Sequence, residues 1–255
     1  MRTFTFKGLF LTVLFMLLGS TAILAADDGS ITTQVDEAGT LPSKISASEK
    51  YLITNLKIVG KINGTDLKFI REMAGCNFYM GKTDGKLSIL DLSEAKIVEG
   101  GSAYVSNSDS YWYTSNDKLG GYVFYGCSGL TSLTIPSSVT SIGYYAFWDC
   151  SGLNSIYVYP EKMPELGTDI FNGCDAKNCI VYVPKGTDIV YWSSEFGYFE
   201  KIVEFDATGI DKVTTSTNAK EVSRYSVNGK RLSAPAKGLN IVKYSDGSVK
   251  KVVVQ

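Results

Sequence analysis

The chain has 255 residues, of which 20% are charged and 44% hydrophobic, and its formal net charge is −1. It contains no histidine, which excludes nucleophiles activated by histidine, histidine general bases and histidine metal sites. The length suits one large domain with a small one attached.

The N-terminal stretch MRTFTFKGLFLTVLFMLLGSTAILAADD has the pattern of a secretory signal. Two basic residues precede a long apolar run, which ends in small residues before two acidic ones. An N-terminal membrane anchor is the alternative, because the run is almost long enough to span a bilayer. The small residues at its end favour a cleaved signal over residues 1–26, with the cut between 22 and 26 and no membrane span afterwards.

The middle of the chain contains an internal repeat. The unit has the form F-x-x-C-x-x-L-x-x-L-x-I-P, and successive copies are 23 and 24 residues apart. Its markers are Phe124, Phe147 and Phe171 together with Cys127, Cys150 and Cys174. Two degenerate units precede these copies, around Leu56 and around Leu90. The segment 64–76 between them has apolar residues at helical spacing and predicts a short helix.

The spacing L-x-x-L-x-L with a period of 20–29 residues is the leucine-rich repeat signature. Its L-x-L part predicts a short strand whose alternate residues point inward. One strand cannot bury its apolar side alone, so successive turns are expected to stack into a parallel sheet. The fold class predicted for residues 27–206 is therefore an α/β, mostly β, solenoid.

The outward position of each L-x-L strand predicts one column of side chains on the concave sheet. The column consists of Lys57, Asp91, Thr134, Tyr157 and Tyr182. Solenoids commonly bind through this face, so these residues are candidate ligand contacts. The alternative is that they are an ordinary solvated column.

The segment 100–121 interrupts the repeat and is predicted to be a long loop rich in Gly, Ser and Asn. Its aromatic residues Tyr104, Tyr111, Trp112 and Tyr113 are candidate ligand contacts, because surface aromatics supply stacking area for sugars or protein partners. The competing interpretation is that these rings cover the edge of the solenoid where the repeat is interrupted.

The repeated cysteines are expected to form a buried column of small apolar side chains. Cys174 and Cys179 are the pair close enough in sequence for a local disulfide, but stacked repeat positions point the same way and suit a bridge poorly. No Cys sits in an evident electropositive, accessible setting, so no catalytic thiol is expected. Acidic pairs follow no calcium-loop spacing, and no catalytic residue, metal site or cofactor is predicted.

Caps are expected at both ends of the solenoid. Residues 38–51 predict a short helix, and the aromatic segment 188–205 predicts the C-terminal seal, with Trp192, Phe196 and Phe199 in the core. Residues 207–218 have the composition of a linker. Residues 219–255 predict a small antiparallel β module of two hairpins, with turns at Asn228-Gly229 and Asp246-Gly247.

The repeat unit, together with the stretches INGTDLKFIREMAGC, GKLSILDLSEAKIV and VYVPKGTDIVYW, resembles the BspA-like leucine-rich repeats of surface proteins in Bacteroides-type bacteria. The resemblance covers residues 38–206. It implies a secreted or cell-surface, non-enzymatic solenoid that binds a protein ligand in adhesion or host contact.

The C-terminal stretch YSVNGKRLSAPAKGLNIVKYSDGSVKKVVV is similar to the sorting domain of a type IX secretion route. That likeness implies the secretion machinery as a partner of residues 219–255. An added β domain without an export role remains the alternative.

Three functions are compared. A surface protein that binds an extracellular protein is the leading hypothesis, and an accessory glycan-binding protein is the second. A carboxylate-based hydrolase is the third, since a pair of carboxylates needs no histidine, but no motif supports it. Neither nucleic acid nor a cofactor is an expected partner.

Overall fold

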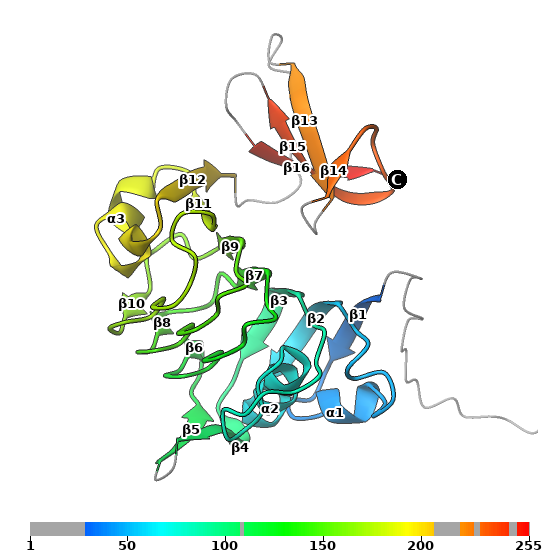
Figure 1. Cartoon of the computed structure of the whole chain (residues 1–255), viewed down its shortest axis with the longest axis vertical. Helices are drawn as coiled ribbons and strands as arrows, with labels where there is room; N and C mark the ends of the chain where they lie inside the picture. Colours follow the sequence, from blue (N-terminus) through cyan, green and yellow to red (C-terminus); the bar gives the residue numbers. More distant parts are fainter. Residues whose placement is uncertain (1–28, 108–109, 207–219, 227–229, 245–248, 255) are drawn as a thin grey trace, which may run out of the picture.

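A computed structural model describes residues 29–107, 110–206, 220–226, 230–244 and 249–254 (Figure 1). The expected signal segment 1–26 and the expected linker 207–218 lie outside these ranges. No helix among the described residues is long and apolar enough to cross a membrane.

Seven parallel strands form one sheet, in the order β1-β2-β3-β7-β9-β11-β12 (Figure 1). They are β1 (Ser30–Val35), β2 (Asn55–Ile62), β3 (Ile89–Ile97), β7 (Ser132–Ile135), β9 (Ser155–Val158), β11 (Ile180–Pro184) and β12 (Lys201–Phe205). Spatial order follows chain order, so each turn of chain lies on the one before it. The parallel leucine-rich repeat solenoid is confirmed. The first strand was not expected, because its sequence SITTQV lacks the repeat spacing.

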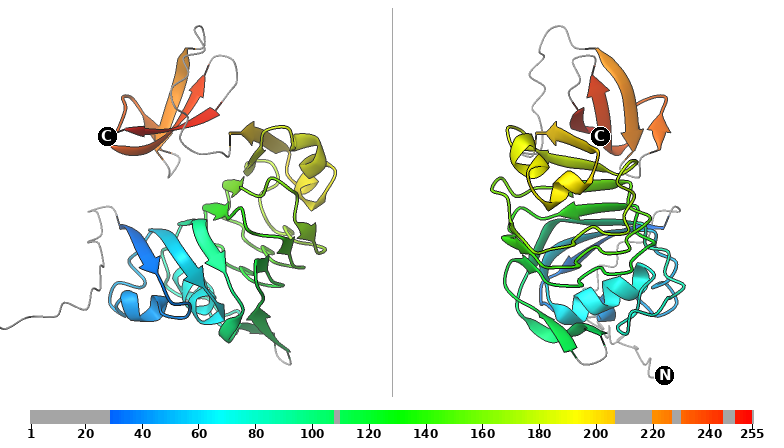
Figure 2. Two further views of the ribbon diagram at one scale, coloured as in Figure 1. Left: turned by 180° about the vertical axis from the view of Figure 1, so that it is seen from behind. Right: turned by 60° about the vertical axis from the view of Figure 1, so that its left-hand side comes forward.

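A second wall closes the coil opposite the main sheet. It carries a three-stranded parallel sheet, in the order β10-β8-β6, seen from behind in Figure 2. The strands are β6 (Lys118–Leu119), β8 (Ser141–Ile142) and β10 (Glu165–Leu166). From each of them the chain enters the turn that carries the repeated Phe and Cys.

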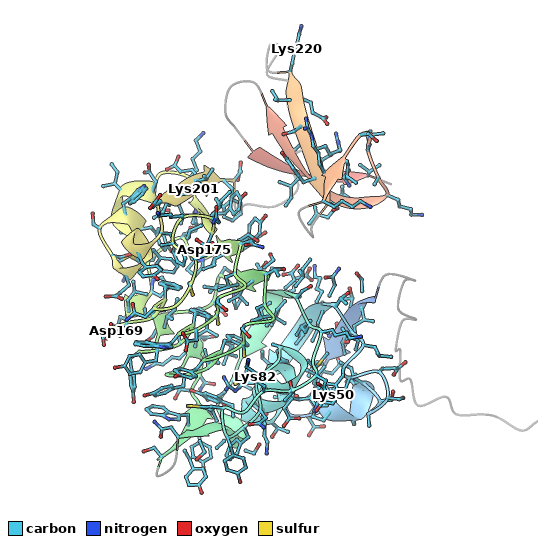
Figure 3. The ribbon with its side chains drawn as sticks, viewed as in Figure 1. Lys50, Lys82, Asp169, Asp175, Lys201 and Lys220 are labelled. Atoms are coloured by element: carbon cyan, nitrogen blue, oxygen red, sulfur yellow. The ribbon has the colours of Figure 1, made fainter. Side chains whose placement is uncertain are left out.

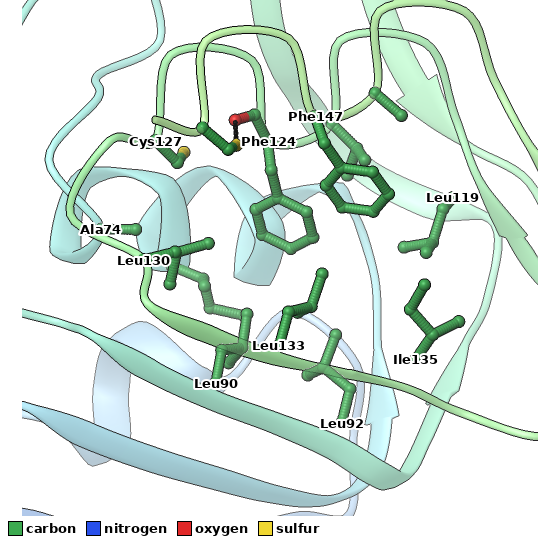
Figure 4. Packing of buried hydrophobic residues seen from close by; sticks show 14 of the residues in the cluster. Ala74, Leu90, Leu92, Leu119, Phe124, Cys127, Leu130, Leu133, Ile135 and Phe147 are labelled. Carbon is green, nitrogen blue, oxygen red and sulfur yellow. Dashed lines mark hydrogen bonds between the residues drawn. The ribbon is translucent and has the colours of Figure 1, made fainter. Parts of the chain in front are cut away.

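The repeated phenylalanines stack inside the coil. The ring centroids of Phe124 and Phe147 are 5.9 Å apart at an interplanar angle of 9°, and those of Phe147 and Phe171 are 5.6 Å apart at 8°. All three are at most 1% exposed. Figure 4 shows Phe124 and Phe147 facing the leucines of the sheet. The Phe column therefore fills the core that the strands enclose.

The cysteines also line this core, and all five are free. The Cys150 thiol donates a hydrogen bond to the Phe124 carbonyl (3.1 Å), and the Cys174 thiol donates one to the Phe147 carbonyl (3.3 Å). Each thiol thus bonds to the preceding turn. The buried column is confirmed, and the candidate bridge between Cys174 and Cys179 is absent.

The N-terminal cap consists of α1 (Leu41–Lys44) and α2 (Gly64–Met73), close to the helices predicted there. Asn63 caps α2, and the buried Asp66 accepts hydrogen bonds from the backbone of Gly39, Leu41 and Asn63 at 2.6–2.9 Å. One carboxylate therefore joins α2 to the segment before α1.

The C-terminal cap consists of α3 (Asp188–Trp192) and a 3₁₀ turn, η1 (Glu195–Tyr198). Phe196 and Phe199 are fully buried, and their ring centroids each lie 4.9 Å from that of Phe171. Trp192 is 44% exposed, so its predicted core position is wrong. Tyr191 takes the inward position of α3 instead and donates its hydroxyl to the Pro160 carbonyl at 3.2 Å.

The segment 100–121 is not an unstructured loop. It forms an antiparallel hairpin of β4 (Gly100–Asn107) and β5 (Ser110–Thr114). Residues with high strand propensity occur in both arms, Tyr104 and Val105 in β4 and the stretch YWYT in β5, and Val105 pairs with Trp112 across the hairpin. The rings predicted to lie on a loop are therefore held on a strand pair.

The C-terminal module is a four-stranded antiparallel sheet in the order β14-β13-β15-β16, as predicted. Its strands are β13 (Glu221–Ser226), β14 (Arg231–Leu232), β15 (Gly238–Tyr244) and β16 (Val249–Val254). The predicted turn residues 228–229 and 246–247 lie outside the described residues.

Candidate ligand-binding surfaces

The main sheet brings the five predicted column residues to one register position. Lys57 pairs with Asp91, Asp91 with Thr134, Thr134 with Tyr157, and Tyr157 with Tyr182. Parallel pairing without a slip between equivalent repeat positions produces this alignment. Whether the column binds a ligand stays a prediction.

Two members of the column are far less accessible than predicted. Thr134 is 7% exposed and Tyr157 is 9% exposed. The Tyr157 ring stacks on the Tyr182 ring with centroids 4.5 Å apart, and Phe205 meets its edge at 6.2 Å. Burial raises the pKa of both tyrosines, so their phenols stay neutral. This end of the sheet offers an aromatic cluster rather than separate exposed side chains.

The other end of the column is polar. Lys57 forms an ion pair with Glu94 on the neighbouring strand, and both side chains are substantially solvent-exposed. Because exposed pairs of this kind stabilise a fold by only about 0–1 kcal/mol, the Lys57 ammonium can exchange partners at small cost.

The hairpin separates its four predicted aromatic contacts. Tyr111 and Tyr113 are 60% and 59% exposed, whereas Tyr104 is fully buried. The Tyr104 hydroxyl donates to the Gly121 carbonyl at 2.8 Å. Tyr104 is therefore a packing residue of the hairpin, and its predicted role as a surface contact is wrong.

Tyr104→Phe is expected to lower the free energy of unfolding by about 1 kcal/mol, the usual net contribution of one hydrogen bond. Urea unfolding followed by circular dichroism measures the change. Tyr111→Phe is the control, since its ring is exposed and should shift the midpoint little. Equal effects of the two changes would contradict the assignment of Tyr104 to the interior.

Trp112 packs on the outer side of two turns of the solenoid. It is half-buried, and its ring centroid lies 5.4 Å from that of Tyr122 and 5.2 Å from that of Tyr144. Tyr122 and Tyr144 belong to two successive turns of the coil. The hairpin thus folds back over the repeat and joins an aromatic group that was not among the predicted contacts.

We name this group the aromatic surface. Its residues are Trp112, Tyr122, Tyr125, Tyr144, Tyr145 and Trp148. Seven ring contacts, with centroids 5.0–5.5 Å apart, connect all six residues. Tyr144 is 37% exposed and the others are intermediate in exposure. A continuous, accessible aromatic group of this size is a candidate binding surface.

The repeat itself places these rings. The backbone N–H of Tyr122 donates to the Tyr144 carbonyl (3.1 Å), and that of Gly126 donates to the Trp148 carbonyl (2.8 Å). Tyr122 and Tyr145 occupy the same repeat position and share a left-handed backbone, with φ of 58° and 55°. Equivalent turns therefore present their aromatic side chains in parallel rows.

The aromatic surface ends at the next turn. Thr168, Asp169 and Asn172 take the repeat positions of Tyr144, Tyr145 and Trp148. Asp169 keeps the left-handed backbone, with φ of 55°, and lies at the outer edge of the repeat region in Figure 3. A polar border on that side is typical of a binding interface, whose core is apolar and whose rim is wet.

A sequence signal for the aromatic surface does exist. The variable positions around the repeated Phe carry Tyr and Trp in two successive units, YVFY and YYAFW. Those positions point away from the core when Phe and Cys point into it. A comparison of the variable positions, and not only of the repeated ones, would have predicted the surface.

A hollow of about 640 Å³ lies beside the turns 137–140 and 159–165, and Glu161 and Glu165 are in its lining. Both glutamates are exposed. A general acid needs a carboxyl group whose environment differs from water, so the hollow lends the hydrolase hypothesis no support.

The described residues contain no group of three or more His, Cys, Asp or Glu side chains placed to hold a metal ion.

Residues 117–233 match a family model described as the BspA type leucine rich repeat region, in six copies. The match begins just before β6 and ends just after β14, so it covers the regular turns and the first part of the C-terminal module. A search among curated proteins found no match for the chain.

Proposed function

We propose that this protein, a solenoid whose repeats are of the BspA leucine-rich type, is an exported, non-catalytic protein that binds an extracellular protein. Adhesion to a host or to another cell is the role we assign to it. The observation that carries the proposal is the aromatic surface, a connected group of six rings at the side of a rigid coil.

The composition of this surface favours a protein partner. Tyrosine and tryptophan are enriched at protein interfaces and among the residues that contribute most to binding. The rings also hold one another in place, so little side-chain entropy is lost when a partner binds. The concave column offers a second contact, with the aromatic pair Tyr157 and Tyr182 at one end.

Tyr144→Ala is expected to weaken binding to the protein partner at least tenfold. The change removes the most exposed ring of the aromatic surface and one of the two rings that contact Trp112. Biolayer interferometry against a panel of immobilised extracellular-matrix proteins provides the measurement. Tyr198→Ala is the matched control, since Tyr198 is 38% exposed, against 37% for Tyr144, and lies in the C-terminal cap. Circular dichroism must show that both variants are folded.

A glycan array run in parallel tests the alternative of an accessory glycan-binding protein, in which Tyr111, Trp112 and Tyr113 stack on sugar rings. Binding to glycans and to no matrix protein would overturn the proposed protein partner. Unchanged binding by both Trp112→Ala and Tyr144→Ala would exclude the aromatic surface and leave the concave column as the site.

The C-terminal module is proposed to be a sorting domain for a type IX secretion route, in a Bacteroides-type bacterium. Its support is the likeness of residues 219–255 to such segments and the compact antiparallel sheet that they form. If the chain without residues 219–255 still reaches the culture medium or the cell surface, the sorting role is wrong.

A further inference from the structure

The turn that follows α2 carries aromatic rings outside the solenoid core. The ring centroid of Phe78 lies 4.9 Å from that of Tyr79, at an interplanar angle of 79°, and 6.2 Å from that of Tyr111 on β5, at 29°. Tyr79 is 77% exposed and Tyr111 is 60% exposed, whereas Phe78 is half-buried. Phe78 therefore connects two tyrosine rings that are mostly open to water.

Hydrogen bonds hold this turn against the hairpin. The backbone N–H of Ser106, on β4, donates to the carbonyl oxygen of Phe78 at 2.9 Å. The side-chain oxygen of Asn77 accepts from the backbone N–H groups of Tyr79 and Gly81, each at 2.9 Å. β4 also packs against α2, beside which it lies in Figure 1. The backbone that carries the rings is therefore fixed before a ligand binds, which reduces the entropy lost on binding.

A cation lies beside the same rings. The Nζ atom of Lys68, on α2, is 4.5 Å from the ring centroid of Phe78, within the range of a cation–π contact. None of the ion pairs between described residues includes Lys68. Glu72, one helical turn further along α2, pairs with Lys50 instead. The ammonium group of Lys68 is therefore available to an anionic group that approaches the rings.

These residues lie on the other side of the hairpin from the aromatic surface. Tyr111 and Trp112 are neighbours on β5, and successive side chains of a strand point to opposite sides. Trp112 packs on Tyr122 and Tyr144, whereas Tyr111 packs on Phe78. The two groups of rings can therefore bind different ligands.

We propose that Lys68, Phe78, Tyr79 and Tyr111 form a second binding site, the cap site, whose ligand is an acidic carbohydrate. The exposed tyrosine rings stack on the apolar face of a sugar ring. The ammonium group of Lys68 binds the carboxylate or sulfate group of the same ligand. The cap site is separate from the aromatic surface and its protein partner, and it shares only Tyr111 with the glycan contacts predicted from the sequence.

Size and charge favour an acidic carbohydrate over a protein at the cap site. A stable protein interface covers about 800 Å² of each partner, far more than two exposed tyrosines and one lysine offer. No hydrogen bond between described residues engages the hydroxyl group of Tyr79 or Tyr111, so both hydroxyls can bond to those of a sugar. The ammonium group adds an attraction that only an acidic sugar can use.

The first test measures binding of the full chain to immobilised carbohydrates by biolayer interferometry. The acidic probes are hyaluronan, sialyllactose and heparin, and their neutral counterparts are carboxyl-reduced hyaluronan, lactose and dextran. We expect at least one acidic probe to bind about tenfold more tightly than its neutral counterpart, with an affinity that falls as salt is raised. Binding of no acidic probe, or equal binding of each acidic probe and its counterpart, would overturn the proposal.

Variants locate the binding on the cap site. Tyr79→Ala and Lys68→Gln should each weaken binding of the acidic probe about tenfold, while Lys68→Arg, which keeps the charge and the cation–π contact, should retain most of it. Tyr198→Ala is the control for the lost ring and Lys201→Gln for the lost charge. Both control residues are exposed and belong to the C-terminal end of the solenoid, where Figure 3 labels Lys201.

Circular dichroism must show that these variants are folded. Equal weakening by the cap-site variants and their controls would mean that the carbohydrate binds elsewhere, and the cap site would be wrong.

Chemical labelling of the unchanged sequence keeps the test independent of how the variants fold. The protein is treated briefly with acetic anhydride, with and without the acidic probe, and each lysine is followed by mass spectrometry after chymotrypsin digestion. The bound probe should slow acetylation of Lys68 several-fold and leave that of Lys201 unchanged. Equal protection of the two lysines would indicate general attraction between charges and would overturn the proposal.

The cap site and the aromatic surface have separate readouts. Binding to matrix proteins tests the aromatic surface, and binding of the acidic probe tests the cap site, so either can fail without the other. Loss of both kinds of binding in folded Tyr79→Ala would mean that the two groups of rings serve one ligand, and a separate cap site would be excluded.

Discussion

Phe147→Ala is expected to lower the free energy of unfolding by about 3–5 kcal/mol, the usual cost of truncating a buried phenylalanine. Phe147 is the middle ring of the Phe column, with Phe124 on one side and Phe171 on the other. Its loss leaves a cavity between two turns that cannot close, because the backbone hydrogen bonds to the neighbouring turns hold their spacing.

Urea unfolding monitored by circular dichroism and by tryptophan fluorescence provides the measurement, with the slope checked against that of the unchanged protein. Tyr113→Ala is the control, since it removes a ring of similar size that is 59% exposed, and surface changes usually stay within about 0.5 kcal/mol. Comparable decreases in the free energy of unfolding for the two variants would mean that packing of the Phe column does not stabilise the core.

Arg71→Ala is expected to lower the free energy of unfolding by about 3–5 kcal/mol, since each buried carbonyl left without a donor costs about 1–3 kcal/mol. The buried guanidinium of Arg71, on α2, donates to three carbonyl oxygens of the turn 122–125, so the loss falls on the junction between α2 and the regular repeats. The cap should then unfold before the turns that follow it.

Arg71→Lys is the informative companion, because an ammonium keeps the charge but has fewer donors and cannot span the same set of carbonyls. Its loss should be smaller than that of Arg71→Ala but clearly measurable. Arg231→Ala, at an exposed site in the C-terminal module, is the control. Hydrogen exchange resolves where the effect falls, and unchanged protection of α2 in Arg71→Ala would contradict the role assigned to this side chain.

The fold could be predicted in large part because it repeats. Leu, Phe and Cys recur with a period of 23–24 residues and point into the coil. Stacking the turns in parallel and in register buries the apolar side of each turn against its neighbours. The alignment of Lys57 with Asp91, Thr134, Tyr157 and Tyr182 followed from the position that each residue takes in its L-x-L strand, although the spacing between the first units is longer than the period. The strand SITTQV at the N-terminal edge of the sheet was not predicted. An edge strand packs against one neighbouring strand only, so its sequence need not contain the full repeat unit.

Local patterns also had clear limits. Tyr104 and Tyr111 stand on the same hairpin and have the same side chain, yet one is fully buried and the other is mostly exposed. The two exposures differ because Tyr104 lies on β4, which packs against α2 and the turn at Gly121, whereas Tyr111 lies on the outer strand β5 and contacts Phe78 with one side of its ring. Glycine and serine content predicted a loop here, and the pairing of strand-forming residues across the segment decided otherwise.

By itself, the sequence determined the solenoid, the alignment of its column residues, the buried Cys column and the C-terminal antiparallel module, because each of these depends on neighbours in the chain or on a motif that recurs along it. Only the tertiary structure decided that Trp112 joins Tyr122 and Tyr144, and that Arg71 meets the turn 122–125. Those contacts join the interrupting hairpin and the cap to the repeat. No period relates such segments, so their packing depends on how the whole chain closes around the core.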